Sequence, residues 1–158
     1  LMNHLLYEEL TDIYLSMGKI KAAQKSLERV FHLCPKSPHG HFLRGFIHCV
    51  NRKYVSAISD LEYADRHSPH RAEVLRHLGW AYFQHGKRAK GIIYLERAGT
   101  IQPINVFIWI DLGMCYLKTK SWDEAISCFS KAIKLDPNDH RAQECLRLAY
   151  ILQNNFAT

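Results

Sequence analysis

Histidine and cysteine are the residues of this chain whose chemistry is most suggestive, because it has ten of the first and five of the second. Cys34, His39 and His41 lie near one another in a segment that also contains Pro35 and Pro38. Thiolate and imidazole groups bind zinc, but a closed zinc site needs four ligands at a recognisable spacing. His39 and His41 are two residues apart, so a helix would point them to different faces. We therefore expect no bound metal.

Catalytic signatures are the next chemistry to search for. The sequence has no HExxH, GxSxG or GxGxxG pattern, and Arg88 follows Gly86 and Lys87 where a phosphate-binding loop requires serine or threonine. No pair of carboxylates stands out from those expected on solvated helix faces. The cysteines are odd in number and form no CxxC pair, so we expect free thiols and a reducing cytoplasm. The sequence predicts neither an enzyme nor a cofactor.

The elements that would have to position any site follow a repeat. Four of the five prolines stand 34 residues apart, a period that is typical of helical repeat proteins. These prolines are Pro35, Pro69, Pro103 and Pro137. A proline ends a helix because it excludes the preceding residue from the α conformation. Counting each proline as position 32 gives the units 4–37, 38–71, 72–105 and 106–139.

Small and large residues recur at fixed positions of these units. Position 8 holds a small residue in each unit, namely Thr11, Gly45, Gly79 and Gly113. Position 24 holds a large apolar one, namely Leu27, Leu61, Leu95 and Phe129. Small residues let two helices approach closely, and large ones fill the space between them. Each unit is therefore predicted to be a pair of amphipathic helices.

The pattern W-x2-L-G-x2-Y, followed by A-x3-F-x2-A-x4-P, resembles the tetratricopeptide repeat. Unit 106–139 has every position of this pattern, and unit 72–105 fits it well, with Leu75 in place of Trp and Gly91 in place of Ala. The resemblance implies an all-α, right-handed superhelical solenoid of four helix-turn-helix repeats, followed by a C-terminal helix. We expect residues 1–158 to form this single domain.

Residues 140–154 carry one more helical pattern. One interpretation is a solvating C-terminal cap, which repeat arrays need, and the other is the first helix of a truncated fifth repeat. Arg147 stands at position 8 of such a fifth unit, where the others have a small residue. Leu148 and Ile151 make the helix apolar on more than one face, so it could also pack against a second copy and form a dimer.

In tetratricopeptide repeat proteins, recurring positions of the first helix of each unit line a concave groove. Carried over to this sequence, these positions imply an aromatic and aliphatic groove that binds an apolar peptide or an amphipathic helix of another protein. The predicted groove residues are Phe42, Phe46, Trp80, Phe83, Phe107, Ile110 and Met114. The alternative is that a neighbouring segment of the same protein fills the groove.

Some members of the family bind a C-terminal carboxylate through lysine, arginine and asparagine in this groove. Here Glu8 and Asp12 stand where a lysine and an asparagine would be expected, and Phe46 replaces another asparagine. Negative charges at that end of the groove would repel a carboxylate. We therefore do not expect this mode of binding.

Cations gather in the predicted turns between the two helices of each unit, and stacking would align them along one edge. This basic ridge comprises Lys19, Lys21, Arg52, Lys53, Lys87, Arg88, Lys90, Lys118 and Lys120. Cations in the first turn of a helix oppose its dipole, so helix stability alone does not explain all of them. The ridge could contact an acidic surface, although ordinary solvated turns are the simpler interpretation. We do not expect nucleic acid as the partner.

Unit 38–71 carries polar residues where the family has apolar ones. These residues are His41, Arg44 and His48, and they share one helix face. A buried Arg44 would need a carboxylate partner. The candidates are Glu28, Asp60 and Asp65. The simpler interpretation is a rotated helix, and the alternative is a polar contact or weak joint between the first two units. The rotated helix would bury Leu43, Ile47 and Val50.

The composition fits a globular binding protein. The 158 residues are 47% hydrophobic and 23% charged, with a formal net charge of +6, no apolar run long enough to span a membrane and no signal-peptide layout. Leu1 precedes Met2, as in a fragment of a longer chain. We predict a protein–protein interaction adaptor or scaffold. The alternatives are a secretion-type chaperone that holds an extended segment, or the regulatory arm of a larger, nucleic-acid-binding protein.

Overall fold

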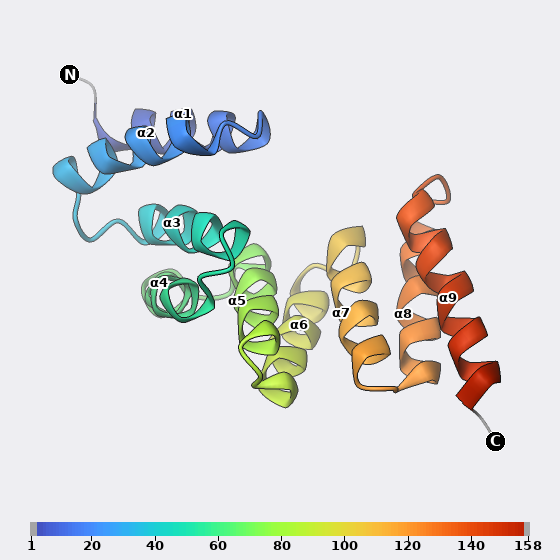
Figure 1. Ribbon diagram of the computed structural model, residues 1–158. Coiled ribbons are helices and arrows are strands. Elements are labelled where there is room, and N and C mark those ends of the chain that lie inside the picture. Colours follow the sequence, from blue (N-terminus) through green and yellow to red (C-terminus); the bar gives the residue numbers. More distant parts are fainter. Residues whose placement is uncertain (1–2, 157–158) are drawn as a thin grey trace.

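The computed structural model describes residues 3–156, which form nine α-helices and no strand, so that residues 1–2 and 157–158 lie outside the description. Figure 1 shows the helices stacked in chain order from one end of the molecule to the other. They are α1 (His4–Ser16), α2 (Ile20–Leu33), α3 (Pro38–Val50), α4 (Tyr54–His67), α5 (Ala72–Gln84), α6 (Arg88–Ile101), α7 (Val106–Lys118), α8 (Trp122–Leu135) and α9 (His140–Phe156).

The helices pack as pairs, α1 with α2, α3 with α4, α5 with α6 and α7 with α8, and these pairs make the most extensive contacts. The backbones of successive odd-numbered helices also approach one another closely, whereas within residues 3–156 those of successive even-numbered helices do not. An ion pair between Lys90 of α6 and Glu62 of α4 spans the wider gap between two even helices. The helices are thus closer together on the odd side of the stack than on the even side. The stack therefore curves, with the odd helices on its concave side. The prediction of an all-α superhelical solenoid is confirmed.

The close approach within each pair depends on the small residue at position 8. A Cβ atom on Gly45 would lie 2.7 Å from Cγ of Leu61, and one on Gly113 would lie 2.6 Å from Cε1 of Phe129. In α1 the same position holds Thr11, which is fully buried and donates its hydroxyl hydrogen to a backbone carbonyl of its own helix at 2.6 Å. The large residues at position 24 therefore occupy the space that the small ones leave.

The turn between the two helices of each pair contains one residue in the left-handed conformation. In the first and third pairs it is a glycine, Gly18 with φ +70° and Gly86 with φ +94°. In the second and fourth pairs it is Arg52 with φ 57° and Lys120 with φ 63°. Glycine adopts this region without the steric cost that a Cβ atom imposes. Two members of the basic ridge thus occupy strained backbone positions.

A buried carboxylate organises the irregular second pair. Asp60 of α4 is only 6% exposed and accepts hydrogen bonds from Nε and Nη2 of Arg44 at 2.8 and 2.6 Å. Nδ1 of His41 lies 2.9 Å from the same carboxylate, and Nε2 of His48 lies 3.6 Å from it. The three polar residues therefore converge on Asp60, which confirms one of the predicted partners for Arg44. The prediction of a rotated helix is wrong for Val50, which is half exposed. Val50 lies in the last turn of α3.

This polar cluster also meets the first pair of helices through one aromatic ring. The guanidinium carbon of Arg44 lies 4.3 Å from the centroid of the Phe31 ring of α2, and the ring of His41 packs edge-on against it at 5.1 Å. Cations and aromatic edges attract such a ring. The joint between the first two pairs is thus polar and aromatic, which supports the alternative of a polar contact between the units.

The last helix, α9, packs on α8 and α7 through the buried Ala142 and Ala149. Arg147 is exposed and stands at the position where α3, α5 and α7 carry the glycine that admits a second helix. This favours a cap over the first helix of another regular repeat. Leu148 and Ile151 remain exposed, and a dimer through this helix stays a prediction.

Candidate functional site

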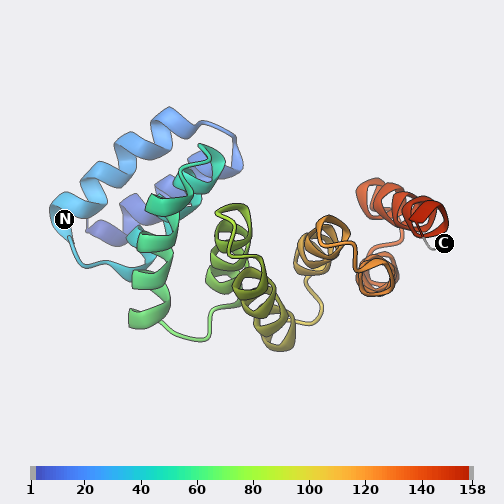
Figure 2. The same ribbon diagram turned by 60° about the horizontal axis from the view of Figure 1, so that its bottom comes forward.

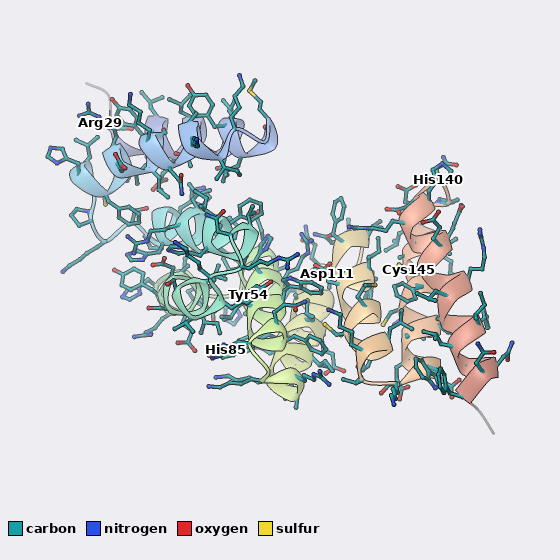
Figure 3. The ribbon with its side chains drawn as sticks, in the orientation of Figure 1. Arg29, Tyr54, His85, Asp111, His140 and Cys145 are labelled. Carbon is teal, nitrogen blue, oxygen red and sulfur yellow. The ribbon has the colours of Figure 1, made fainter. Side chains whose placement is uncertain are left out.

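Two neighbouring hollows lie on the concave side of the molecule, and both include Arg76. The smaller, of about 220 Å³, is formed by α3, α5 and α7 and is lined by Phe46, Cys49, Val50, Arg76, His77, Trp80 and Asp111. The larger, of about 610 Å³, lies at the amino-terminal ends of α5 and α7 and is lined by Arg71, Ala72, Glu73, Arg76, Ile101, Gln102, Asn105 and Phe107. We call the two together the odd-helix groove. Figure 3 shows Asp111 of α7 on the side of that helix that faces α5.

Three of the seven predicted groove residues are not accessible. Phe42, Phe83 and Ile110 are 2%, 4% and 1% exposed, and each belongs to the hydrophobic core. The prediction that they face a partner is therefore corrected. The physical reason is that neighbouring odd helices touch, so side chains at these positions fill the contact between them. Phe42 of α3, for example, packs against His77 of α5 with ring centroids 5.7 Å apart.

The other four predicted groove residues stay at the surface. Phe46 and Trp80 are half-buried and line the smaller hollow, and Phe107 is 52% exposed and lines the larger one. Met114 is half-buried with its Sδ 3.7 Å from Sγ of Cys145, so it packs towards α9, away from both hollows. The fold thus brings three of the predicted residues together around Arg76.

Cationic side chains lie over the aromatic rings of the groove. The guanidinium carbons of Arg76 and Arg141 are 5.3 and 5.9 Å from the centroid of the Phe107 ring, and Nζ of Lys118 is 5.5 Å from that of Trp80. The negative face of an aromatic ring attracts such cations. The groove is therefore a mixed aromatic and basic surface, not the purely apolar one that the sequence suggested. Arg76 and Arg141 stand at groove positions of the repeat, and this position in the sequence could have identified them as groove residues.

Arg76 is held in place by an ion pair that joins α5 to α7. Its Nε donates a hydrogen bond to Oδ2 of Asp111 at 2.6 Å, and both side chains are largely buried. Burial raises the pKa of Asp111, and the charge of Arg76 only partly offsets this effect. The ion pair fixes one guanidinium group at the boundary between the two hollows.

A second polar chain crosses the amino-terminal part of the groove. Nε2 of His39 lies 2.9 Å from Oδ2 of Asp12, and its Nδ1 lies 3.4 Å from both Nη1 and Nη2 of Arg71. Glu8, which was expected to make this end acidic together with Asp12, is buried instead. It accepts a hydrogen bond from the hydroxyl of Ser37, the residue that caps α3. Only Asp12 therefore presents the expected negative charge.

The floor of the smaller hollow is electrically neutral. His77 packs between Phe42 and Phe46, and its ring meets that of Phe46 edge-on with centroids 5.0 Å apart. Burial lowers the pKa of His77 to about 3, and the positive charge of Arg76 acts in the same direction. His77 is thus uncharged at neutral pH and adds a neutral ring beside Phe46 and Trp80 in the lining of the smaller hollow.

This low pKa predicts acid sensitivity. The unfolded chain protonates His77 near pH 6.5 and the folded chain does so only near pH 3, so the unfolded state binds more protons and stability falls as the pH drops between these values. We expect the free energy of unfolding to fall by about 1 kcal/mol more between pH 6 and pH 5 in the wild type than in His77→Gln. Urea denaturation at the two pH values measures this difference. His85→Gln, in the exposed turn after α5, is the control and should keep the wild-type pH dependence; equal slopes for His77→Gln and wild type would contradict the prediction.

All nine cations of the basic ridge are exposed, and Figure 2 shows the turns that follow α1, α3 and α5 on one side of the molecule. Lys90 has a structural partner, because its Nζ donates to the hydroxyl oxygen of Tyr82 at 2.8 Å and lies 3.9 Å from Glu62. This contact accounts for a cation in the first turn of α6, where the helix dipole alone disfavours it. A contact between the ridge and an acidic partner surface stays a prediction.

The cysteines are free, and three of them have pKa values that do not suit nucleophilic chemistry. Burial raises the pKa of Cys49 and Cys115 to about 12 and that of Cys128 to about 11, so these thiols stay protonated at neutral pH. Within residues 3–156, no three His, Cys, Asp or Glu side chains are arranged to hold a metal ion. None of the helices in this part of the chain is long and apolar enough to cross a membrane.

Comparison with known proteins agrees with the repeat pattern. Residues 6–37 and 106–139 each match a family model described as "Tetratricopeptide repeat". The chain is similar to the tetratricopeptide repeat-containing protein trd-1 of Caenorhabditis elegans, with 23% identity over 146 residues that cover 92% of this chain and 18% of the relative. It is also similar to anaphase-promoting complex subunit 3 of Schizosaccharomyces pombe, with 26% identity over 121 residues that cover 77% of this chain and 18% of that protein. The chain spans less than a fifth of the length of these two relatives.

Solved structures resemble the fold as well. A chain in the crystal structure of the APC/C hetero-tetramer Cut9–Hcn1 superimposes with a TM-score of 0.86 at 20% sequence identity, covering 94% of this chain and 30% of that one. At this level of identity, the similarity shows a shared helical solenoid.

Proposed function

This chain is a tetratricopeptide repeat protein, and we propose that it is a non-enzymatic adaptor that binds a segment of another protein in its odd-helix groove. The observation that carries the proposal is the cluster of three accessible aromatic rings, Phe46, Trp80 and Phe107, in two adjoining hollows. Burying one large apolar side chain contributes about 1.5–3 kcal/mol, so two or three anchors leave a useful affinity after the entropic costs of binding.

Two further features support a peptide or an amphipathic helix as the bound segment. The neutral His77 adds an uncharged ring to Phe46 and Trp80 in the smaller hollow, so the aromatic part of its lining suits an aliphatic or aromatic side chain of the partner. The arginines at the rim provide hydrogen-bond donors that can orient the segment. One relative is named as a subunit of the anaphase-promoting complex, and a scaffold role within an assembly is compatible with this groove. Five free cysteines make the reducing cytoplasm the compartment that we propose.

The proposal is tested by removing two anchors at once. Peptides that bind the full wild-type chain are first selected from a random library displayed on phage. Their affinities are then measured by fluorescence anisotropy with the wild type and with a variant carrying Phe46→Ala and Trp80→Ala. We expect the variant to bind at least about tenfold more weakly, because truncating a central aromatic anchor costs about 1 kcal/mol or more at many interfaces.

The matched control carries Val55→Ala and Ile93→Ala, two exposed apolar residues on the even helices α4 and α6. It should bind the selected peptides like the wild type. Thermal unfolding followed by circular dichroism shows whether each variant is folded at the temperature of the binding assay. A groove variant that loses stability yet binds the peptides as tightly as the wild type would contradict the proposal, as would a wild-type chain that selects no peptide.

A further inference from the structure

We infer that the segment bound in the odd-helix groove presents a carboxylate side chain to Arg71 in the larger hollow, next to an apolar side chain that lies on Phe107. This inference rests on the proposed function and adds the chemistry by which the groove selects its partner. It concerns an aspartate or glutamate within the segment, so it differs from the recognition of a chain's C-terminal carboxylate.

Arg71 is a half-buried guanidinium group whose donors are largely unused. Its side chain is 31% exposed and lines the larger hollow. Its Nη1 and Nη2 both approach the same atom, Nδ1 of His39, at 3.4 Å, and one face of the group lies 5.4 Å from the Phe42 ring centroid. Among residues 3–156, the only carboxylate within 4 Å is that of Glu73, at 3.7 Å, which is longer than a hydrogen bond. Both Nη atoms are turned towards His39 in long contacts, which leaves Nε and the remaining Nη hydrogens as donors for a bidentate contact with a ligand.

The other arginine of the hollow is already occupied. Nε of Arg76 donates to Asp111 at 2.6 Å, and its guanidinium carbon lies 5.3 Å from the Phe107 ring. Arg141 approaches the same ring from α9 at 5.9 Å and contributes to the positive potential around Asp111. Phe107 thus lies between two cations while half of its surface remains exposed. A partner side chain that covers this ring would be flanked by guanidinium groups.

The charges around the hollow favour one negative charge on the ligand. Three guanidinium groups, of Arg71, Arg76 and Arg141, lie at the hollow with two carboxylates, of Glu73 and Asp111. The next carboxylate, of Asp12, is separated from Arg71 by His39, with which it pairs at 2.9 Å. One positive charge is left over, and it matches a single carboxylate. A phosphate group carries up to two negative charges near neutral pH, and the second would face Glu73. The geometry of the fork suits either group, but the charge balance selects the carboxylate.

The test uses the peptides that the full wild-type chain selects from a random phage library. We expect these peptides to be enriched in aspartate or glutamate beside a large apolar residue. Replacing that acid by its amide should weaken binding to the wild type by about tenfold to a hundredfold, the range for a hydrogen bond between charged groups. The same replacement should change little when the protein carries Arg71→Gln, so that the two changes are coupled in a double-mutant cycle.

Three further measurements decide the details. Arg66→Gln, an exposed arginine on α4 outside the groove, is the control and should leave the preference for acid unchanged. A protein with Arg71→Glu should prefer the peptide whose acid is replaced by lysine, which requires a folded variant and so excludes simple unfolding as the cause. A phosphoserine at the acidic position should bind the wild type more weakly than aspartate does.

Each possible result supports or overturns the inference. Peptides that bind without any acidic preference, or an acidic preference that survives Arg71→Gln, would overturn it and leave the proposed function standing. Tighter binding of phosphoserine would overturn the choice of a carboxylate. If the wild type selects no peptide at all, the proposed function fails and this inference fails with it.

Discussion

Replacing Gly91 with alanine is expected to lower the free energy of unfolding by about 2–3 kcal/mol, because overpacking a well-packed contact costs about that much. A Cβ atom at this position would lie 2.5 Å from the carbonyl oxygen of Gly79 and 2.7 Å from the backbone nitrogen of Phe83. Both are backbone atoms of α5, so no side-chain rotation relieves the overlap. The whole of α6 would have to move away from α5, which would loosen the packing of the buried Leu95.

The neighbouring units explain why this effect is specific to the third pair. The same position holds alanine in the other three units, namely Ala23, Ala57 and Ala125. Only in α5 and α6 do glycines face each other at both close positions, since a Cβ on Gly79 would lie 2.8 Å from the carbonyl oxygen of Gly91. The helices α5 and α6 therefore pack more closely than the other pairs. Alanine, which is the normal residue at this position in the other units, is damaging here.

Urea denaturation followed by circular dichroism measures the effect of Gly91→Ala. Gly99→Ala, in the same helix, is the matched control, because its Cβ would meet Cη2 of Trp109 at 3.1 Å, the far end of a side chain that can shift. We expect the control to lose less than about 1 kcal/mol. Equal losses in the two variants would show that the close backbone contact does not limit the packing of α5 and α6.

Asp60→Asn is expected to lower the free energy of unfolding by about 2–3 kcal/mol at pH 7. The substitution removes the charge that pairs with Arg44 and His41, and it places an amide donor among groups that are themselves donors. Breaking a fully buried ion pair costs about 3–5 kcal/mol, but the Arg44 side chain is 41% exposed and can turn towards water, which reduces the loss.

The pH dependence of this contribution has a defined sign. Burial alone would raise the pKa of Asp60, but the hydrogen bonds from Arg44 and His41 outweigh it and hold that pKa below its ordinary value. The stabilisation is therefore fully present above the ordinary aspartate pKa of about 4. It is lost as the pH falls through the lower pKa that Asp60 has in the folded state. The difference between wild type and Asp60→Asn should shrink in strong acid.

Asp65→Asn provides the control for Asp60→Asn. Asp65 lies on the same helix and makes no ion pair within residues 3–156, so its replacement should change stability by less than about 0.5 kcal/mol. Urea denaturation at pH 7 and at about pH 2, below the ordinary aspartate pKa, measures both variants. If Asp60→Asn and Asp65→Asn behave alike at pH 7, the buried carboxylate does not stabilise the second pair in the way the contacts imply.

The sequence predicts the fold well because the contact within each helix pair recurs with the period of the sequence repeat. Gly45, Gly79 and Gly113 recur at the place where a Cβ atom would overlap the facing helix, so their spacing reports a steric requirement of the structure. Asp60 was also within reach of sequence reasoning, since Arg44 needs a carboxylate and few are near. Choosing among three candidates required the observed distances.

The accessible part of the groove was harder to predict. Phe42 and Phe46 both stand at groove positions of α3, yet the first is buried between odd helices and the second borders a hollow. The repeat pattern does not distinguish them, because their burial depends on how closely one unit packs on the next. Arg71 lies in the connection before α5, outside the helical positions that the pattern describes. Its contact with His39 follows only from the folded geometry.

The unequal packing of odd and even helices has a mechanical consequence. Because the backbones of consecutive odd helices approach closely and those of consecutive even helices do not, the array can bend about the line of contacts between its odd helices. A small rotation at each contact between two odd helices would change the curvature of the molecule without separating the helices of a pair. Rotations at successive contacts would add up along the chain. The first two pairs are joined differently, because Phe31 of α2 meets a guanidinium group and an imidazole ring of α3 in place of aliphatic side chains. We expect a change of curvature to occur most readily at this joint near the amino-terminal end, because a rotation there shifts polar and aromatic contacts and leaves the helix pairs intact.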